Sequence, residues 1–352
     1  MNKKKSFTLM FLLIIFLFVV VLLISRDKIS PISKNNLEKV RVQAGWIING
    51  EFANVCSALV NGYYADNGLD VEIVPGGPTG ASFILATNAI AQDPSLTIGI
   101  EGDMVPLIRG KSKEIEGEKL QVKTFAAFWN TNPYGFIVRK DSGLNNIKDF
   151  AKRKPDGKKY KIGVTSDSII QNALANDLGI SVSDMNIVIV GFDSTPFLTG
   201  QVDAQAGFWT SLSYEADKAG IPNNFISASE ISGFNQPAMV VEATEKTLTE
   251  KSELLSRWLH ATIKGTDFVI KSPEIASQQI LDKRCGGPTL NQQQEEWLIK
   301  KSIPLFDTSK IGWVYESQIT DFAKIFYKLG QIPFTPSSED LIDYSILKTI
   351  YK

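Results

Sequence analysis

The segment from Gly62 to Ile73 constrains the fold most strongly, because it joins a helix to a strand within a few residues. It reads Gly-Tyr-Tyr-Ala-Asp-Asn-Gly-Leu-Asp-Val-Glu-Ile. Glycine commonly ends a helix, and the alternation of apolar and acidic residues from Leu69 is typical of a strand with one buried face. Another apparent strand, Val40–Val42, precedes this segment. The pattern therefore predicts a βαβ unit and an α/β fold.

Strand-like and helix-like segments continue to alternate in two series, separated by a break at Asn132-Pro133. Two such series predict two lobes, each a mainly parallel sheet with flanking helices. From Glu242 to Lys352 apolar residues recur at helical spacing, so this part is expected to be almost entirely helical. The expected strands are Val40–Val42, Leu69–Val74, Leu96–Ile100, Val122–Phe128, Gly135–Arg139, Tyr160–Val164, Asn186–Val190 and Gln205–Trp209. The expected helices between them are Phe52–Asn61, Thr79–Ile90, Asp103–Gly110, Ile147–Arg153 and Ser168–Leu178.

Two crossings between the lobes are expected, near Asn130–Tyr134 and Ser232–Ala238. Each contains a proline and small or polar residues, which suit a hinge. Lobe 1 is then residues 38–129 and 233–352, and lobe 2 is residues 130–232. A single doubly wound domain with a helical appendage is the alternative.

The N-terminus carries a membrane-length apolar run from Phe7 to Ile24, preceded by Lys3, Lys4 and Lys5. The run lacks the small-residue pattern of a cleaved signal, and no lipid-accepting cysteine follows it. We expect a signal anchor at residues 1–28 and a tether at 29–37, with the rest of the chain extracytoplasmic. Cleavage, which would give a secreted or periplasmic protein, is the alternative.

Charge and composition exclude several classes of function. The net charge is −1, and no stripe of Lys and Arg indicates nucleic-acid binding. The single histidine, His260, argues against a histidine-dependent triad or a multi-histidine metal site, and no cofactor is expected. Cys56 and Cys285 are expected to be two unpaired buried thiols, with a disulfide outside the cytoplasm as the alternative.

Candidate binding residues follow the predicted strands, at the sheet edge where open α/β proteins bind ligands. The glycine-rich turn from Gly76 to Ser82 is expected to present backbone N–H groups at the start of a helix. In Glu101-Gly102-Asp103, Asp103 is expected to cap the following helix. The candidate ligand-binding residues are Trp46, Asn49, Phe52, Thr79, Gly80, Ser82, Glu101, Trp129, Asn130, Ser166, Ser168, Phe208 and Trp209.

Two motifs resemble the thiamine-precursor (pyrimidine)-type solute-binding proteins of ABC importers. The first is W-x-x-N at Trp46–Asn49, followed by a helix and the Gly62–Ile73 segment. The second is Gly200-Gln201-Val202-Asp203-Ala204, followed by a strand that ends in Phe208-Trp209. The resemblance implies a type II periplasmic-binding-protein fold and a ring-stacking tryptophan at Trp46. The chain departs from the family pattern in three places: Phe52 replaces a histidine, and Thr210 and Leu212 replace an asparagine and a glutamate.

The resemblance implies an extracytoplasmic receptor that passes a small molecule to the permease subunits of an ABC importer. We expect a monomer that is not an enzyme. The candidate residues are rich in aromatic rings and hydroxyls and include no arginine, which favours a planar heteroaromatic ligand such as a thiamine pyrimidine precursor or a riboflavin-like molecule. A receptor for sulfonate or nitrate is the alternative, and a pyrimidine-synthase-like enzyme is a less favoured one.

Overall fold

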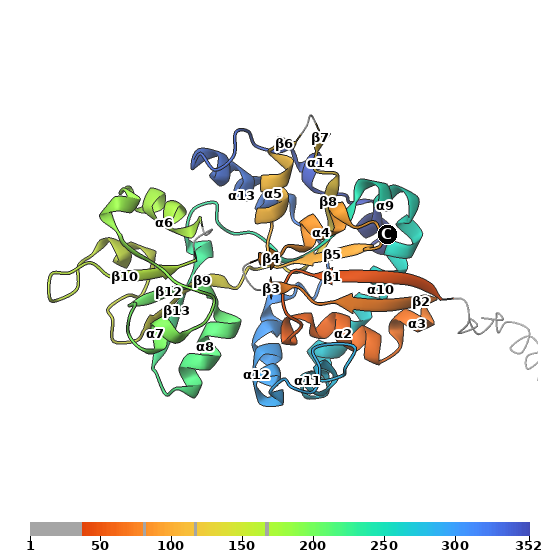
Figure 1. The fold of residues 1–352 in the computed structure, drawn as a ribbon, viewed down its shortest axis with the longest axis horizontal. Helices are drawn as coiled ribbons and strands as arrows, with labels where there is room; N and C mark the ends of the chain where they lie inside the picture. Colours follow the sequence, from red (N-terminus) through yellow and green to blue (C-terminus); the bar gives the residue numbers. More distant parts are fainter. Residues whose placement is uncertain (1–36, 80–81, 116–117, 166–168) are drawn as a thin grey trace, which may run out of the picture.

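The computed structural model describes residues 37–79, 82–115, 118–165 and 169–352. Figure 1 shows two lobes side by side along the long axis, joined at the middle of the molecule. One lobe holds the first strands of the chain and its C-terminal helices, and the other holds the middle of the sequence. Each lobe is built on a five-stranded sheet.

The sheet of lobe 1 has the strand order β2-β1-β5-β14-β8. Strand β1 is parallel to β2 and β5, whereas β14 is antiparallel to both β5 and β8. The strands are β1 (Glu38–Ala44), β2 (Leu69–Val74), β5 (Ile98–Glu101), β8 (Val122–Trp129) and β14 (Ala238–Thr244).

The sheet of lobe 2 repeats this pattern in the order β11-β10-β12-β9-β13. Its reversed strand is β9, which is antiparallel to β12 and β13. Both sheets are therefore mixed rather than mainly parallel. The first strand after each crossing between the lobes, β9 or β14, is antiparallel to both of its neighbours. The strands are β9 (Tyr134–Arg139), β10 (Lys161–Val164), β11 (Asn186–Ile189), β12 (Ala204–Phe208) and β13 (Asn223–Ser227).

Helices of lobe 1 cover the first sheet and bury its core. Helix α10 (Ser252–Lys271) buries Trp258 and Leu259 completely and packs on α2 (Ala53–Val60). Gly265 permits this approach, because a Cβ there would lie 2.2 Å from the carbonyl oxygen of Asn54. The other helices of the lobe are α3 (Tyr63–Asp66), α4 (Ala86–Gln92), α5 (Val105–Lys111), α9 (Glu245–Glu250), α11 (Pro273–Ile280), α12 (Gln292–Ser302), α13 (Glu316–Lys328), α14 (Ser338–Leu341) and α15 (Ser345–Ile350), with the 3₁₀ turns η1 (Gly50–Phe52) and η5 (Ile303–Leu305).

Lobe 2 uses shorter helices. The segment expected as a helix at Ile147–Arg153 is the 3₁₀ turn η2 (Ile147–Ala151), which begins at a capping box formed by Asn146 and Asp149. The expected strand end at Trp209 is instead the first residue of α8 (Trp209–Lys218). The remaining helices and 3₁₀ turns are α6 (Ile170–Leu178), η3 (Val182–Asp184), α7 (Thr195–Leu198) and η4 (Ala228–Glu230).

The predicted helix over Thr79–Ile90 is wrong in its first half. The structure has a hairpin there, β3 (Gly77–Thr79) and β4 (Ser82–Ile84), and α4 begins at Ala86. Gly77 has a φ of 93°, which a right-handed helix does not allow. A Cβ at Gly76 would lie 2.0 Å from the carbonyl oxygen of Ala44, so the chain passes β1 as extended backbone instead.

The prediction of an almost entirely helical segment from Glu242 onward is wrong at its start, and β13 and β14 were not predicted. Strand β14 lies between β5 and β8 in the interior of the first sheet, and Ala238 to Ala243 are all buried. A strand that is buried on both faces reads as a continuous apolar run and lacks the alternation by which strands are recognised.

Cys56 and Cys285 form a disulfide with a Cα–Cα distance of 5.9 Å, which corrects the expectation of two free thiols. Cys56 lies on α2 and Cys285 follows α11, and the packing of these helices brings together residues that are 229 positions apart. A Cα–Cα distance of this size suits a disulfide.

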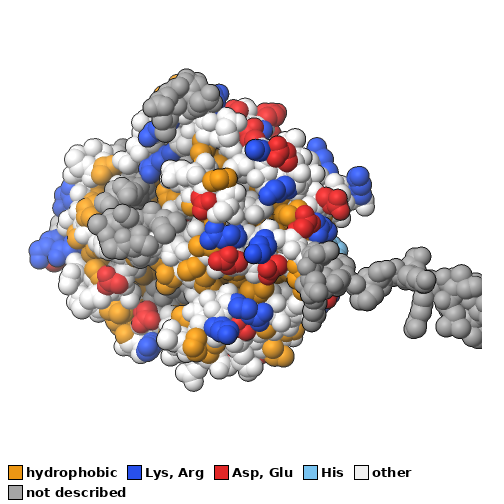
Figure 2. Space-filling model, turned by 45° about the vertical axis from the view of Figure 1, so that its right-hand side comes forward, with side chains coloured by type: hydrophobic (Ala, Val, Ile, Leu, Met, Phe, Trp, Pro, Cys, Tyr) orange, Lys and Arg blue, Asp and Glu red, His pale blue; other side chains and the backbone are white. Residues whose placement is uncertain are grey.

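The described surface carries interspersed charges. Figure 2 shows Lys and Arg side chains close to Asp and Glu side chains over one face of the molecule. Ion pairs between described residues include Lys300 with Glu296 at 2.8 Å and Lys324 with Asp321 at 2.9 Å. This face thus lacks the single-sign patch that nucleic-acid binding requires.

Among the described residues, no helix has the length and apolar character needed to span a membrane. The predicted anchor at residues 1–28 lies outside those residues.

Candidate ligand-binding site

Aromatic rings from the two lobes meet where the strands end. Trp46 follows β1, and its ring contacts the ring of Phe192, which follows β11, at a centroid distance of 5.4 Å and an interplanar angle of 60°. Trp209 of lobe 2 contacts Trp297 of α12 in lobe 1 at 6.3 Å. These edge-to-face contacts are geometries that aromatic pairs favour. They bring segments that follow strand ends in both lobes together at the junction.

Phe208 also lies at this junction. Its ring packs edge-on against Tyr134, with a centroid distance of 6.0 Å. A Cβ placed on Gly102 would lie 3.8 Å from Phe208 Cζ, so the ring stands against the loop that follows β5 of lobe 1. The end of β12 therefore faces the end of β5 across the junction.

A polar contact crosses the junction next to these rings. The hydroxyl of Thr210 donates to Glu51 Oε1 at 3.1 Å, and both residues are buried. The side chain of Asn49 accepts the N–H of Glu51 at 3.0 Å, so this candidate fixes the turn that carries Glu51. Burial raises the pKa of Glu51 to about 7, and the charge of Glu295 adds to this effect while the bond from Thr210 opposes it.

Sequence reasoning includes the hydroxyl of Thr210 among the site candidates, although Thr210 departs from the family pattern, but it does not select Glu51, which follows the W-x-x-N motif. An acidic residue two positions after Asn49, in a turn otherwise apolar or small, was the available signal. A contact between residues 159 positions apart gives no local sequence pattern.

Glu101 ends β5 and is buried. It accepts the N–H of Ala86 at 2.8 Å and that of Gly102 at 3.2 Å, so it holds the start of α4 against the sheet. Burial raises the pKa of Glu101 to about 8, with a further contribution from the charge of Asp103. The carboxylate of Asp103 accepts the N–H of Val105 at 2.8 Å, at the first residue of α5, although Met104 rather than Asp103 occupies the N-cap position.

Glu242 of β14 is a second buried carboxyl group in lobe 1. It accepts a hydrogen bond from Thr87 at 2.6 Å, and burial raises its pKa to about 8. Within the described residues, no three His, Cys, Asp or Glu side chains are grouped so as to hold a metal ion.

Three candidates lie in well-packed surroundings. Phe52 and Trp129 belong to the hydrophobic core, with exposed fractions of 2% and 1%. Asn130 donates its N–H to the carbonyl of Leu305 at 2.8 Å, and its own carbonyl accepts from Gln318 at 2.9 Å. Phe52 and Trp129 thus pack in the core, and backbone hydrogen bonds hold Asn130 at the first crossing.

The remaining candidates lie in or near turns. Thr79 and Ser82 are paired across the β3–β4 hairpin, not at the start of a helix as expected. Gly80, Ser166 and Ser168 lie outside the described residues. A ligand-binding role for all of these candidates stays a prediction.

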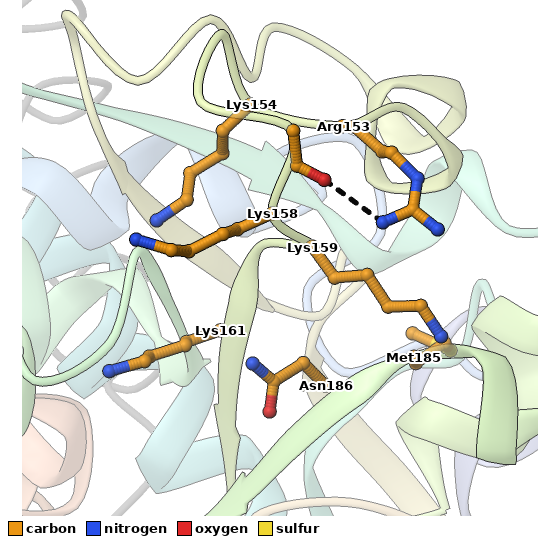
Figure 3. Close-up of a pocket in the computed structure, with 8 residues that line it drawn as sticks. Arg153, Lys154, Lys158, Lys159, Lys161, Met185 and Asn186 are labelled. Carbon is orange, nitrogen blue, oxygen red and sulfur yellow. Dashed lines mark hydrogen bonds between the residues drawn. The ribbon is translucent and has the colours of Figure 1, made fainter.

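A basic cavity of about 490 Å³ lies elsewhere, on lobe 2, where β10 and β11 begin (Figure 3). This is the opposite end of those strands from the aromatic junction. Lys154 pairs with Asp203 at 3.3 Å and Lys158 with Asp156 at 3.1 Å. Arg153 donates to the carbonyl of Gly157 at 3.0 Å, the dashed contact in Figure 3. Intramolecular contacts therefore occupy three of the five cationic side chains that line the cavity.

Known proteins share the fold and the sequence pattern. A formylaminopyrimidine-binding protein of Halalkalibacterium halodurans is 25% identical over 306 residues, which cover 84% of this chain and 84% of that protein. The riboflavin-binding protein RibY of Chloroflexus aurantiacus is 21% identical over 81% of this chain and 79% of that protein.

The periplasmic nitrate-binding protein NrtA of Synechocystis PCC 6803 superposes with a TM-score of 0.65, at 10% identity, over 89% of this chain and 88% of that one. This similarity shows a two-lobed type II periplasmic-binding-protein fold with two mixed sheets. The family model described as NMT1/THI5 like matches residues 49–276. The resemblance inferred from the two motifs is thereby confirmed, and the chain belongs to the NMT1/THI5-like family.

Proposed function

We propose that this protein is the extracytoplasmic solute-binding component of an ABC importer and that it binds a small planar heteroaromatic nutrient between its lobes. One observation carries the proposal: aromatic rings of the two lobes contact each other at the junction, and three of them, Trp46, Phe192 and Trp209, follow strand ends. Trp46 contacts Phe192 there, and Trp209 contacts Trp297. A flat ring inserted among these side chains would gain stacking contacts from each lobe, and so would favour the closed arrangement.

The chemistry of the junction supports a ring rather than an anion. Its described contacts are made by aromatic rings, by the Thr210 hydroxyl and by the Glu51 carboxyl group, which suit a flat ring better than an anion. Arg139 lies at the far end of β9, where its guanidinium donates to the carbonyls of Phe197 and Leu198 at 3.2 and 3.1 Å. The ligands for which two relatives are named, a formylaminopyrimidine and riboflavin, are both heteroaromatic.

Leu212 argues for a binding mode that differs from the commonest one in the family. Where the family pattern has a glutamate, Leu212 is 4% exposed and packs in a small apolar cluster of lobe 2. It therefore supplies no polar contact to a pyrimidine. This favours a larger or less basic ring.

A binding role suits the chain better than catalysis by a histidine. Phe52 occupies the position of the family's histidine and is buried. His260, the chain's single histidine, is exposed on α10, a helix that packs on α2 within lobe 1. The junction thus lacks the histidine from which a pyrimidine-synthase-like enzyme would make its product.

We also propose that residues 1–28 anchor the protein in the membrane with the two lobes outside the cytoplasm. The apolar run from Phe7 to Ile24 supports an anchor, and the Cys56–Cys285 disulfide suits an oxidising compartment. Permease subunits of the importer would be the partners of a monomer. Full-length protein should stay with the membrane after a high-salt wash. Recovery in the soluble fraction with a new N-terminus near Ser30 would instead mean cleavage.

A ligand panel tests the proposed function. Full-length protein in detergent would be melted with hydroxymethylpyrimidine, its formylated relative, thiamine, riboflavin, taurine and nitrate. At about 100 times Kd, a ligand should stabilise the protein by about 2.7 kcal/mol, a rise of a few degrees in Tm. We expect that rise with a heteroaromatic compound. A rise with taurine or nitrate alone would rule out the heteroaromatic ligand.

A further inference from the structure

A buried hydrogen bond joins the two lobes beside the aromatic junction. Thr210, in the first turn of α8, donates to Glu51 Oε1 at 3.1 Å. The exposed fractions of Thr210 and Glu51 are 1% and 6%, although the two residues belong to different lobes. Separation of the lobes would break this bond.

Glu51 is buried without a cation beside it. The titratable group that faces it is Glu295 of α12, which accepts the N–H of Gly50 at 2.6 Å. Helix α2 carries no charged residue, and Glu215, five positions after Thr210, lies on another face of α8. The other charged groups on the helices around η1 contact residues other than Glu51. Glu274 and Glu296 pair with Lys300, and Asp217 accepts a hydrogen bond from Asn223. Lys301 lies over the ring of Trp297, and Lys218 lies over the ring of Tyr214.

We propose that the Thr210–Glu51 hydrogen bond is a latch for the closed arrangement of the lobes, and that Glu51 takes up a proton when the latch closes. This inference rests on the proposed function, because a receptor must open to release its ligand. A carboxylate moved from water into a site that holds a second carboxyl group and no cation favours its protonated form.

The direction of the pH dependence follows from this proton. The pKa of Glu51 is raised to about 7 in the closed arrangement, from an ordinary value of 4.5 when exposed. The closed arrangement therefore binds more protons than the open one. Its stabilisation is fully present below the exposed value and is lost as the pH rises through about 7. Acidification should close the lobes.

The experiment measures the distance between the lobes without ligand. Full-length protein in lipid nanodiscs would carry a fluorophore pair at Asp70→Cys in lobe 1 and Lys158→Cys in lobe 2, both exposed positions. The native cysteines are held in their disulfide and do not react. From about pH 8 to about pH 5, the ratio of closed to open molecules should rise by roughly tenfold to a hundredfold.

Variants separate the latch from general stability. Glu51→Gln should remain closed at both pH values, because the amide mimics the protonated acid. Glu242→Gln, which alters a buried carboxyl group that bonds to Thr87 within lobe 1, should keep the pH response. Thr210→Val should lower the closed-to-open ratio by about fivefold, the scale of one lost hydrogen bond. Far-UV circular dichroism would establish that each variant is folded.

The latch is overturned if wild type and Glu51→Gln respond equally to pH, or if Thr210→Val leaves the ratio unchanged. If Glu51→Gln does not fold, Thr210→Val and the response of the wild type decide the question. Failure of every compound in the ligand panel, with the pH response intact, would reject the proposed ligand class and keep the latch. Ligand binding without any pH response would support the proposed ligand class and reject the latch.

Discussion

The two lobes share one strand topology but bring different chemistry to their junction. Lobe 1 contributes carboxyl groups that burial keeps from ionising readily, Glu51 and Glu101, with Glu242 behind them in the same lobe. Lobe 2 contributes rings and a hydroxyl, Phe208 and Thr210. The topology therefore supplies two similar edges. Both carry aromatic rings, whereas these buried carboxyl groups lie on lobe 1 and the hydroxyl that bonds to one of them lies on lobe 2.

The lobes also differ in what stabilises them. In lobe 1 the Cys56–Cys285 disulfide joins α2 to the loop after α11, close behind the Trp46–Asn49 turn. A Cβ at Gly286, the residue after Cys285, would lie 2.7 Å from the carbonyl oxygen of Ile48. Lobe 2 has no disulfide and relies in part on a small apolar cluster: Ile137, Phe197, Val202, Leu212 and Ala216. The junction edge of lobe 1 should thus be the more firmly held.

Removal of the disulfide should have the largest effect on the difference in stability between the two lobes. The Cys56→Ser, Cys285→Ser double variant should lower the free energy of unfolding by about 2–5 kcal/mol, because the bond closes a long loop in the unfolded chain. Urea denaturation of both proteins under identical conditions would measure the loss. An unchanged midpoint and slope would show that lobe 1 does not depend on this bond.

The buried carboxyl groups of lobe 1 should make its stability depend on pH. The pKa of Glu242 is raised to about 8, so its contribution is complete below the ordinary value of 4.5 and is lost as the pH rises through about 8. Glu242→Gln should reduce this alkaline loss by an amount on the order of 3 kcal/mol. The exposed Glu274→Gln variant, which serves as the control, should lose stability on the alkaline side as the wild type does. Identical pH profiles for wild type and Glu242→Gln would contradict the assignment.

Removal of one ring from each lobe tests whether both surfaces hold the ligand. Trp46→Ala and Trp209→Ala should each weaken binding by about 1–3 kcal/mol, the scale for loss of a stacked ring. Trp313→Ala is the matched control, because Trp313 packs against Tyr344 and Tyr351 within lobe 1. Titration calorimetry would measure Kd. Normal binding by both junction variants would place these rings in the core instead.

The smallest effect is expected at a capping residue of lobe 2. Asn146→Ala removes the side chain that accepts the N–H of Lys148 at 3.0 Å at the start of η2. The loss of stability should be about 1 kcal/mol, with ligand affinity unchanged. Chemical denaturation and calorimetry on the same sample would check both. A loss of affinity as well would show that η2 and the junction are coupled.

Local patterns predict the outer part of the fold well. Leu69–Val74 was predicted residue for residue, because this strand alternates buried and exposed positions. Ala238–Thr244 was missed because it is almost fully buried and has no alternation. The β3–β4 hairpin was missed because glycine and proline at Gly76–Pro78 were interpreted as the entry to a helix. Their actual role is a close passage beside β1.

Site residues that follow strand ends could be predicted from the sequence. Site residues that are defined by a contact with a distant residue could not. Trp46, Phe208 and Trp209 were selected because they follow or end strands, and the structure brings each of them into contact with a partner across or beside the junction. Phe192 and Glu51 were not selected, because nothing in their local sequence indicates the residue that each contacts in the other lobe. Contacts of this kind are decided by how the two sheets face each other, which a local pattern does not encode.

The central claim is that one ring-shaped ligand contacts both lobes at the aromatic junction, and the six tryptophans can report it directly. Protein labelled with ¹⁵N-tryptophan would be titrated with the compound that gives the largest thermal shift, and single tryptophan variants would assign the indole signals. We expect the signals of Trp46 and Trp209 to move together in one saturable transition. Trp258, fully buried in the core of lobe 1, should not move. Movement confined to one lobe, or saturation that leaves both junction signals in place, would contradict it.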